Sequence, residues 1–183
     1  MKIWTATTLA MLAGTCLLAA CTDTPSSDLP PGRSSCTPAP FGPPFTAVDP
    51  CSGEAVMGAA TETMFTYRPA EGLDRRRAFD AAIPLLEPGF ARAAAPAAVA
   101  LAPVTAAVWR HWQDARVTVA AAVRVTNDDH PPDTGTRMAR TLAVTLTPSD
   151  GTSVLGLVVF AVASRVQSAR GTRWLLANAQ VAS

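Results

Sequence analysis

Apolar side chains recur every three or four positions in the first part of the folded region, which is the spacing of a helix with one buried face. Over residues 54–67 this stripe consists of Val56, Met57, Ala60, Met64 and Phe65. A second helix is expected after Asp74, whose side chain can cap it. Its apolar positions are Phe79, Ile83 and Leu86. Pro84 and Pro88 are expected to kink or divide this segment, because proline lacks a backbone N–H.

A third helix is expected to begin at Pro103, after an alanine-rich stretch, and to run through Gln113, since proline suits the first helical position. Beyond it apolar and polar residues alternate, as they do in strands. The alternation predicts strands over residues 117–126, 138–147, 153–167 and 173–182, with a polar loop over 127–135 and turns at Asp150-Gly151 and Arg170-Gly171-Thr172. Helices followed by an antiparallel meander indicate an α+β domain, in which the N-terminal helices pack on a four-stranded sheet.

The third predicted strand has the most apolar centre of the four. Residues 154–162 are apolar at both odd and even positions, that is, on both faces of the strand. We therefore expect the substitution Val158→Asp to unfold the domain, because a buried charge without a partner is costly.

The N-terminus has the pattern of an export signal: one positive charge at Lys2, an apolar run over residues 3–20 and small residues at its end. The run closes with Leu18-Ala19-Ala20-Cys21, which resembles the lipobox of bacterial lipoproteins. The resemblance implies that the chain is cleaved before Cys21 and that this cysteine carries diacylglycerol and acyl chains such as palmitate. The alternative is an uncleaved membrane anchor, since the run is just long enough to span a bilayer. Either alternative places the rest of the chain outside the cytoplasm, at the cell membrane.

Residues 22–50 are dense in proline, serine, threonine and glycine, a composition typical of a semi-rigid spacer. A proline-rich ligand for a partner protein is the sharper alternative. We therefore expect three parts: a lipoprotein signal peptide over 1–20, the lipidated cysteine and its tether over 21–50, and an α+β domain over 51–183. Cys36 and Cys51 are expected to form a disulfide in an oxidising compartment, with two free thiols as the alternative.

The charges of the chain exclude one class of partner. The 15 basic and 14 acidic residues nearly balance, and the only lysine is Lys2, so the chain cleaved after residue 20 is formally neutral. A nucleic-acid-binding protein normally has a basic excess, and attraction to anionic lipid cannot be the main membrane attachment. The hydrophobic fraction of 49% is too high for general disorder.

Two short motifs flank the predicted sheet: Trp109-Arg110-His111-Trp112 before the first strand and Gly171-Thr172-Arg173-Trp174 at the last. Together with the order of elements over residues 51–183, they resemble the cone-shaped, cystatin-like fold of the nuclear transport factor two superfamily. Exported actinobacterial proteins associated with mammalian-cell-entry transporters, and periplasmic domains of type IV secretion scaffold proteins, are similar. The resemblance implies helices packed into the concave face of a curved sheet.

The cone of such a fold can hold a ligand. The candidate pocket-lining residues here are Tyr67, Phe79, Trp109 and Trp112. Core packing is the alternative for the two tryptophans, which share one helix face. Some superfamily members are isomerases or dehydratases, and the acid–base candidates for such chemistry here are Glu62, Tyr67 and Asp80, all on the N-terminal helices. The predicted strands offer almost no inward-facing acid or base, which departs from the catalytic members.

Other chemistry has little support in the sequence. The motifs of serine hydrolases, zinc proteases, dinucleotide-binding and P-loop proteins are absent, so no cofactor and no catalytic residue is assigned. Asp128-Asp129-His130 with Asp133 is the one cluster with metal-ligand character, and we expect it to be a solvated loop, with no metal. Arg75-Arg76-Arg77 is expected to be solvated, with a contact to lipid headgroups or a partner as the alternative.

These observations favour a non-catalytic accessory or scaffold domain of an envelope assembly, anchored to the membrane and bound to a protein partner. The alternative is a lipoprotein that binds a small apolar ligand or lipid in the cone. An enzyme of the isomerase or dehydratase type is the third hypothesis.

Overall fold

The computed structural model describes residues 36–182, so the predicted signal, Cys21 and most of the predicted tether lie outside the described residues. The helices are α1 (Gly53–Phe65), α2 (Arg75–Ala82), α3 (Pro88–Ala94) and α4 (Ala106–Asp114), with short 3₁₀ turns η1 (Pro69–Glu71), η2 (Ile83–Leu85) and η3 (Ala95–Ala100). Four strands follow: β1 (Val119–Val125), β2 (Arg137–Pro148), β3 (Leu155–Ser168) and β4 (Gly171–Val181). In the described part of the chain, no helix is both long and apolar enough to span a membrane.

Side chains at the helix starts explain where the helices begin. Asp74 accepts a hydrogen bond from the backbone N–H of Arg77 at 2.9 Å, which confirms the predicted cap of α2. Proline divides the next segment as predicted, because Pro84 lies in η2 and Pro88 is the first residue of α3. The predicted start of the last helix at Pro103 is wrong. Thr105 caps the backbone N–H of Val108 instead, and α4 begins at Ala106.

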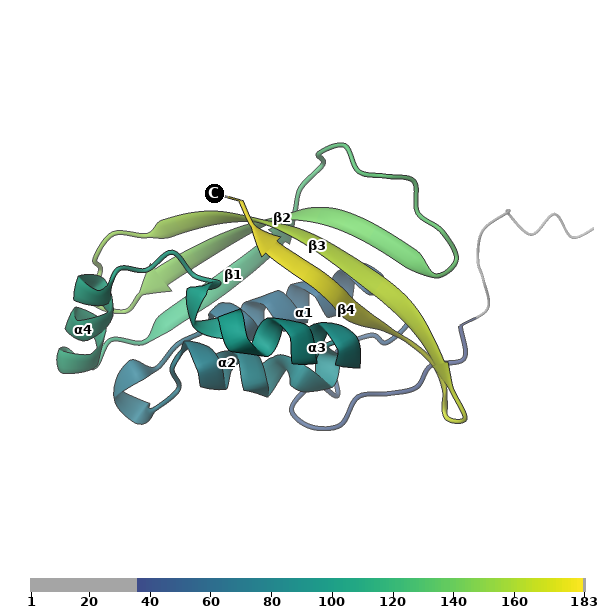
Figure 1. Ribbon diagram of the computed structural model, residues 1–183, viewed down its shortest axis with the longest axis horizontal. Helices are drawn as coiled ribbons and strands as arrows, with labels where there is room; N and C mark the ends of the chain where they lie inside the picture. The colour runs from purple at the N-terminus through teal and green to yellow at the C-terminus, as the bar shows by residue number, and fades with distance from the viewer. Residues whose placement is uncertain (1–35, 183) are drawn as a thin grey trace, which may run out of the picture. The chain divides into compact units, whose positions relative to one another are not determined.

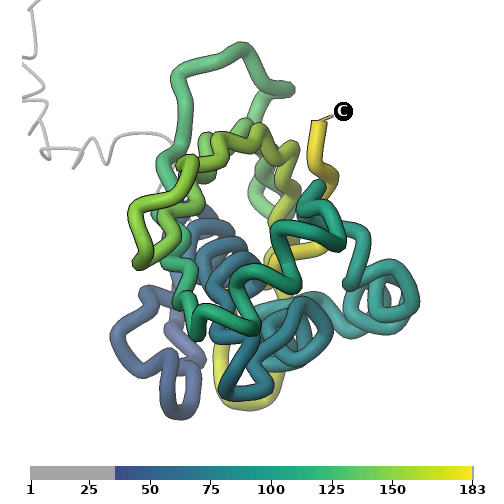
Figure 2. Tube along the Cα trace, turned by 90° about the vertical axis from the view of Figure 1, so that its left-hand side faces the viewer, coloured from purple at the N-terminus to yellow at the C-terminus, as the bar shows by residue number. Residues whose placement is uncertain are grey.

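The strands form one antiparallel sheet in the order β1-β2-β3-β4, each paired with its neighbour along the chain (Figure 1). The α+β class and the four-stranded antiparallel meander predicted from the sequence are therefore confirmed. The register pairs Arg124 with Ala143 and Ala143 with Val158, so alternate residues of neighbouring strands share a face. Seen along its length, the sheet is curled and arches over the helices (Figure 2).

Helices cover one face of this sheet. Helix α1 contacts all four strands and packs against α2, and its buried side chains include Val56, Met57 and Met64. Leu142, Val144 and Leu146 from β2 and Val159 from β3 lie in the same core, each at most 1% exposed. Burial of this single cluster provides the main stabilisation of the domain.

The alternation of β3 corrects one expectation from the sequence. Val159 is fully buried, whereas its neighbours Val158 and Phe160 are 43% and 52% exposed. Val158 therefore lies on the face that no helix covers, and the expectation that Val158→Asp unfolds the domain is wrong. A charged side chain would enter the core at position 159 instead.

Part of the segment assigned to the tether packs against the domain. Cys36 and Cys51 form the predicted disulfide, with their Cα atoms 5.9 Å apart. Between them Phe41 and Phe45 are buried in the core, and Ala39 donates a backbone hydrogen bond to the carbonyl of Thr172 at 2.9 Å. Residues 36–50 thus line the domain as a strap held at both ends by the disulfide.

Candidate functional site

The four aromatic residues expected to line a pocket lie in the hydrophobic core. Tyr67 and Phe79 are 1% exposed, Trp112 is 2% exposed and Trp109 is partly buried against the core. Trp109 makes edge-on ring contacts with Tyr67 and Trp112, with ring centroids 5.5 Å and 5.9 Å apart. The Arg75 guanidinium carbon lies 4.8 Å from the centroid of the Trp109 ring. A side chain facing an open cavity would retain accessible surface. These side chains therefore fill the interior beneath the sheet.

The three acid–base candidates, Glu62, Tyr67 and Asp80, lie in different environments. Burial raises the pKa of Tyr67 above its ordinary value, an effect that the nearby Arg75 charge only partly offsets, so its phenol stays neutral at physiological pH. Asp80 is about half exposed and pairs with Arg76 at 3.5 Å on the surface of α2. Glu62 is exposed beside a shallow hollow of about 310 Å³ between α1 and α2. General acid–base catalysis needs an acid and a base close together in one protected pocket. Glu62, Tyr67 and Asp80 do not share such a pocket.

The acidic loop between β1 and β2 is held by one arginine. Arg140 of β2 forms a bidentate pair with Asp133, both N···O distances being 2.7 Å, and its Nε donates to Glu54 of α1 at 2.7 Å. The Arg140 side chain is only 10% exposed. His130 lies 3.3 Å from the same guanidinium, and Asp128 accepts from the hydroxyl of Thr126. The loop is thus tied to β2 and to α1, and among the described residues no three potential ligands converge on a metal position.

Replacing Arg140 by glutamine tests this attachment through the titration of Asp133. The hydrogen bond from Arg140 is the main cause that holds the pKa of Asp133 below its ordinary value. We expect this pKa to rise to the ordinary range in Arg140→Gln, as followed by NMR of the carboxyl carbon. Because the folded-state pKa is depressed, the pair stabilises the protein above the unfolded pKa of about 3.9. That contribution disappears as pH falls through the folded value.

The difference in melting temperature between wild type and Arg140→Gln should therefore be largest near neutral pH and shrink in acid. Arg124→Gln serves as the control, because Arg124 is an exposed arginine on the neighbouring strand that pairs with no carboxylate within residues 36–182. An unchanged pKa of Asp133 in Arg140→Gln would contradict the proposed attachment.

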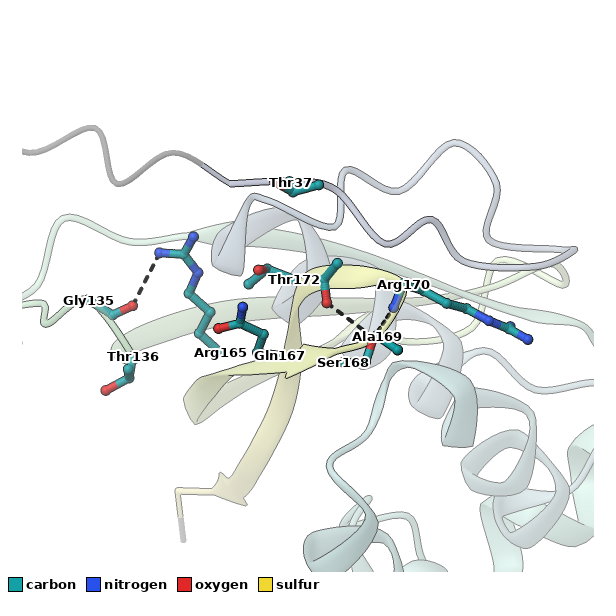
Figure 3. Close-up of a pocket in the computed structure, with 10 residues that line it drawn as sticks. Thr37, Gly135, Thr136, Arg165, Gln167, Ser168, Ala169, Arg170 and Thr172 are labelled. Atoms are coloured by element: carbon teal, nitrogen blue, oxygen red, sulfur yellow. Dashed lines mark hydrogen bonds between the residues drawn. The ribbon is translucent and has the colours of Figure 1, made fainter.

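A polar pocket of about 740 Å³ lies beside the tip of the β3–β4 hairpin (Figure 3). Its lining comes from three separate parts of the chain: Thr37, Gly135, Thr136, Arg165, Gln167, Ser168, Ala169, Arg170, Gly171 and Thr172. None of these residues is acidic or aromatic. Sequence analysis missed this pocket, because the lining residues are adjacent only after the strands pair.

The outer face of the sheet, which helices do not cover, is the second surface that sequence analysis missed. We define it by alternate positions of the four strands, with Val154 just before β3: Ala120, Ala122, Arg124, Arg137, Ala139, Thr141, Ala143, Thr145, Thr147, Val154, Gly156, Val158, Phe160, Val162, Asn178 and Gln180. Two large apolar side chains on it, Val158 and Phe160, are 43% and 52% exposed, and Val154, just before β3, is 58% exposed. Arg124 and Arg137 carry the charges of this set, and they lie on β1 and β2, whereas Val158 and Phe160 lie on β3.

Comparisons with known proteins add no assignment to these surfaces. No protein-family model matches the chain, and neither the curated proteins nor the solved structures contain a significant match.

Proposed function

We propose that the protein is a non-catalytic interaction domain, anchored by lipid to the outer side of the cell membrane, that serves as an accessory or scaffold subunit of an envelope assembly. The observation that carries the proposal is the outer face of the sheet, which is exposed, apolar and nearly uncharged. Its occupant, we infer, is a protein partner in the envelope.

The composition of the outer face differs from what an antiparallel sheet in water usually presents. When one face packs on the core, the other is normally polar, with alternating charged residues. Here threonine, alanine, valine and phenylalanine occupy most of these positions, and Arg124 and Arg137 are the charged exceptions. Contiguous exposed apolar surface on a soluble domain marks an interaction site, and the centres of protein–protein interfaces are depleted in charge. Phe160 supplies the aromatic side chain typical of an interface anchor.

The location in this proposal is supported by two separate features. The Leu18-Ala19-Ala20-Cys21 motif predicts lipidation at Cys21, and the Cys36–Cys51 disulfide suits an oxidising compartment. The curled sheet over helices also fits the cystatin-like cone that we propose for the fold. The buried state of Tyr67, Phe79 and Trp112 favours a partner on the outside of the cone over an apolar ligand within it.

Photocrosslinking in the producing bacterium tests the docking surface. Benzoylphenylalanine is placed at Phe160, on the outer face, or at Glu71, an exposed residue of η1 on the helical side. We expect one discrete adduct from position 160 and none from position 71. Equal adducts from both positions, or none from position 160, would contradict the proposal. Mass spectrometry of the protein extracted from membranes checks the anchor: wild type should begin at a lipid-modified Cys21, whereas Cys21→Ser should keep residues 1–20 and carry no lipid.

A further inference from the structure

The sheet has two edge strands, β1 and β4, and other segments cover them unequally (Figure 1). Along the first part of β4, Thr172 exchanges backbone hydrogen bonds with the strap, and the carbonyl of Leu176 accepts from the backbone N–H of Glu87 at 2.8 Å. At the start of β1, Val119 and Tyr67 exchange two backbone hydrogen bonds of 2.8 and 3.0 Å. The rest of β1 has no such cover in the described part of the chain.

The hydrogen bonds at the two ends of β1 show which of its backbone groups are unpaired. Thr126 donates to the carbonyl of Thr141, and the carbonyl of Thr118 accepts from the backbone N–H of Ser149, so even-numbered residues bond to β2. In an antiparallel pair such residues alternate with residues whose N–H and C=O groups point away from the neighbouring strand. Three residues of β1 therefore direct both backbone groups outward with no partner among the described residues: Ala121, Val123 and Val125.

This edge lacks the features that usually keep edge strands from pairing. Natural proteins protect such edges with lysine, proline, inward-facing charges or a bulge. Residues 119–125 contain no lysine and no proline, their register with β2 runs without a shift, and their side chains on the helical face are alanine and valine. Val123 and Val125 are only partly buried against the core. An added strand would satisfy the outward backbone groups and cover these two valines.

We propose that the protein partner of the outer face also adds a strand to β1 along residues 121–125. This inference rests on the proposed function, because it assigns both contacts to one partner. The added segment is extended, with apolar side chains at alternate positions beside Val123 and Val125, and with a carboxylate on its other face beside Arg124. An extended polypeptide is the ligand that matches this edge, because its own N–H and C=O groups recur at the spacing of the strand.

The charge at this edge favours a different protein over a second copy of the chain. Arg124 is exposed on the outer face and pairs with no carboxylate of residues 36–182. Antiparallel pairing of two β1 strands centred on Val123 would place Arg124 opposite Ala122 of the second copy. The two Arg124 side chains would then be diagonal neighbours, within reach of each other and alike in charge. A carboxylate on the added strand would instead form an opposite-charge pair with Arg124.

One partner can reach both the edge and the outer face. The register places Arg124 beside Ala143 and Ala143 beside Val158, in one row across β1, β2 and β3. Neighbouring strands lie about 4.8 Å apart, so this row spans about 10 Å. A protein–protein interface of ordinary size buries about 800 Å² on each side, which is ample for that distance. A strand added to β1 would therefore belong to the same interface as Val158 and Phe160.

Photocrosslinking from position 160 in the producing bacterium, repeated in two variants of Val123, tests the added strand. Val123→Pro removes an N–H that makes no bond to β2, so the domain should still fold, as a cooperative melt checks. We expect this variant to reduce the adduct about fivefold or more, since a hydrogen bond contributes about 1 kcal/mol. Val123→Thr keeps both the N–H and the branched side chain, so it should give as much adduct as wild type.

Arg124→Glu is a second test that leaves the backbone unchanged. It places a carboxylate beside the carboxylate of the added strand, so the adduct should fall further than in Arg124→Gln. The added strand is overturned if folded Val123→Pro gives the wild-type adduct or if Val123→Thr loses as much adduct as Val123→Pro. If Val123→Pro does not fold, a wild-type adduct from Arg124→Glu overturns it.

The same experiment separates this inference from the proposed function. A strong wild-type adduct that Val123→Pro and Arg124→Glu leave unchanged overturns the added strand and leaves docking at the outer face intact. Absence of the wild-type adduct at position 160 overturns both. An adduct whose mass equals two copies of this chain overturns the choice of a different protein as the occupant of the edge.

Discussion

Val159→Asp should abolish the cooperative thermal unfolding of the domain, whereas Val158→Asp, one residue earlier, should melt within a few degrees of wild type. Val159 is fully buried beneath the helices, so an aspartate there would place an unpaired carboxylate in the core. Burying an unpaired charge costs about 4–5 kcal/mol or more, which is comparable to the whole stability of a small domain. Val158 is 43% exposed on the outer face, where water solvates the carboxylate.

Circular dichroism melts of the two variants measure this difference directly. The pair is matched in chemistry and in strand, and it differs only in the face of the sheet. If both variants unfold, the outer face is covered by other parts of the chain. If both fold normally, the assignment of Val159 to the core is wrong.

Loss of the Cys36–Cys51 disulfide should lower the melting temperature by roughly 6–12 °C. The bridge joins residues 15 apart in the sequence, and a loop of that size corresponds to about 3 kcal/mol in the chain-entropy model. The bridge also holds the strap that buries Phe41 and Phe45, so its loss should let residues 36–50 leave the domain more easily. The double variant Cys36→Ser/Cys51→Ser avoids an unpaired thiol, and calorimetry measures the shift.

Reduction provides the control for this prediction. Dithiothreitol should lower the melting temperature of wild type to that of the double variant and leave the double variant unchanged. Equal melting temperatures of wild type and double variant, without reductant, would show that the disulfide does not stabilise the folded strap.

The elements of the fold could be predicted from the sequence because their signals are local. The spacing of apolar residues indicated α1 and the strands. Asp74 marked the start of α2, and Pro84 and Pro88 marked its end. Local signals also compete, as the start of α4 shows. Pro103 is favourable at a first helical position, but the side chain of Thr105 caps the helix, which therefore begins after it.

The outer face and the hairpin pocket could not be predicted, because they depend on tertiary structure. The run 154–162 is apolar on both faces, and the covered face is decided by α1, which packs on the side of Val159. The pocket depends on the pairing of β3 with β4 and on the close approach of Thr37 to Gly171. Phe41 and Phe45 were the one available signal that residues 36–50 pack against the domain, and the high proline content favoured a spacer instead.

Native gel electrophoresis of detergent-solubilised membranes, with wild type and Val158→Asp compared at equal expression, tests the central claim most directly. The claim is that the outer face of the sheet binds a protein partner, and Val158→Asp places a charge in its centre while the domain stays folded. We expect wild type to migrate in a complex larger than the lipidated protein alone and Val158→Asp to migrate as the free protein. If folded Val158→Asp enters the same complex as wild type, or wild type itself migrates free, the outer face is not the docking surface.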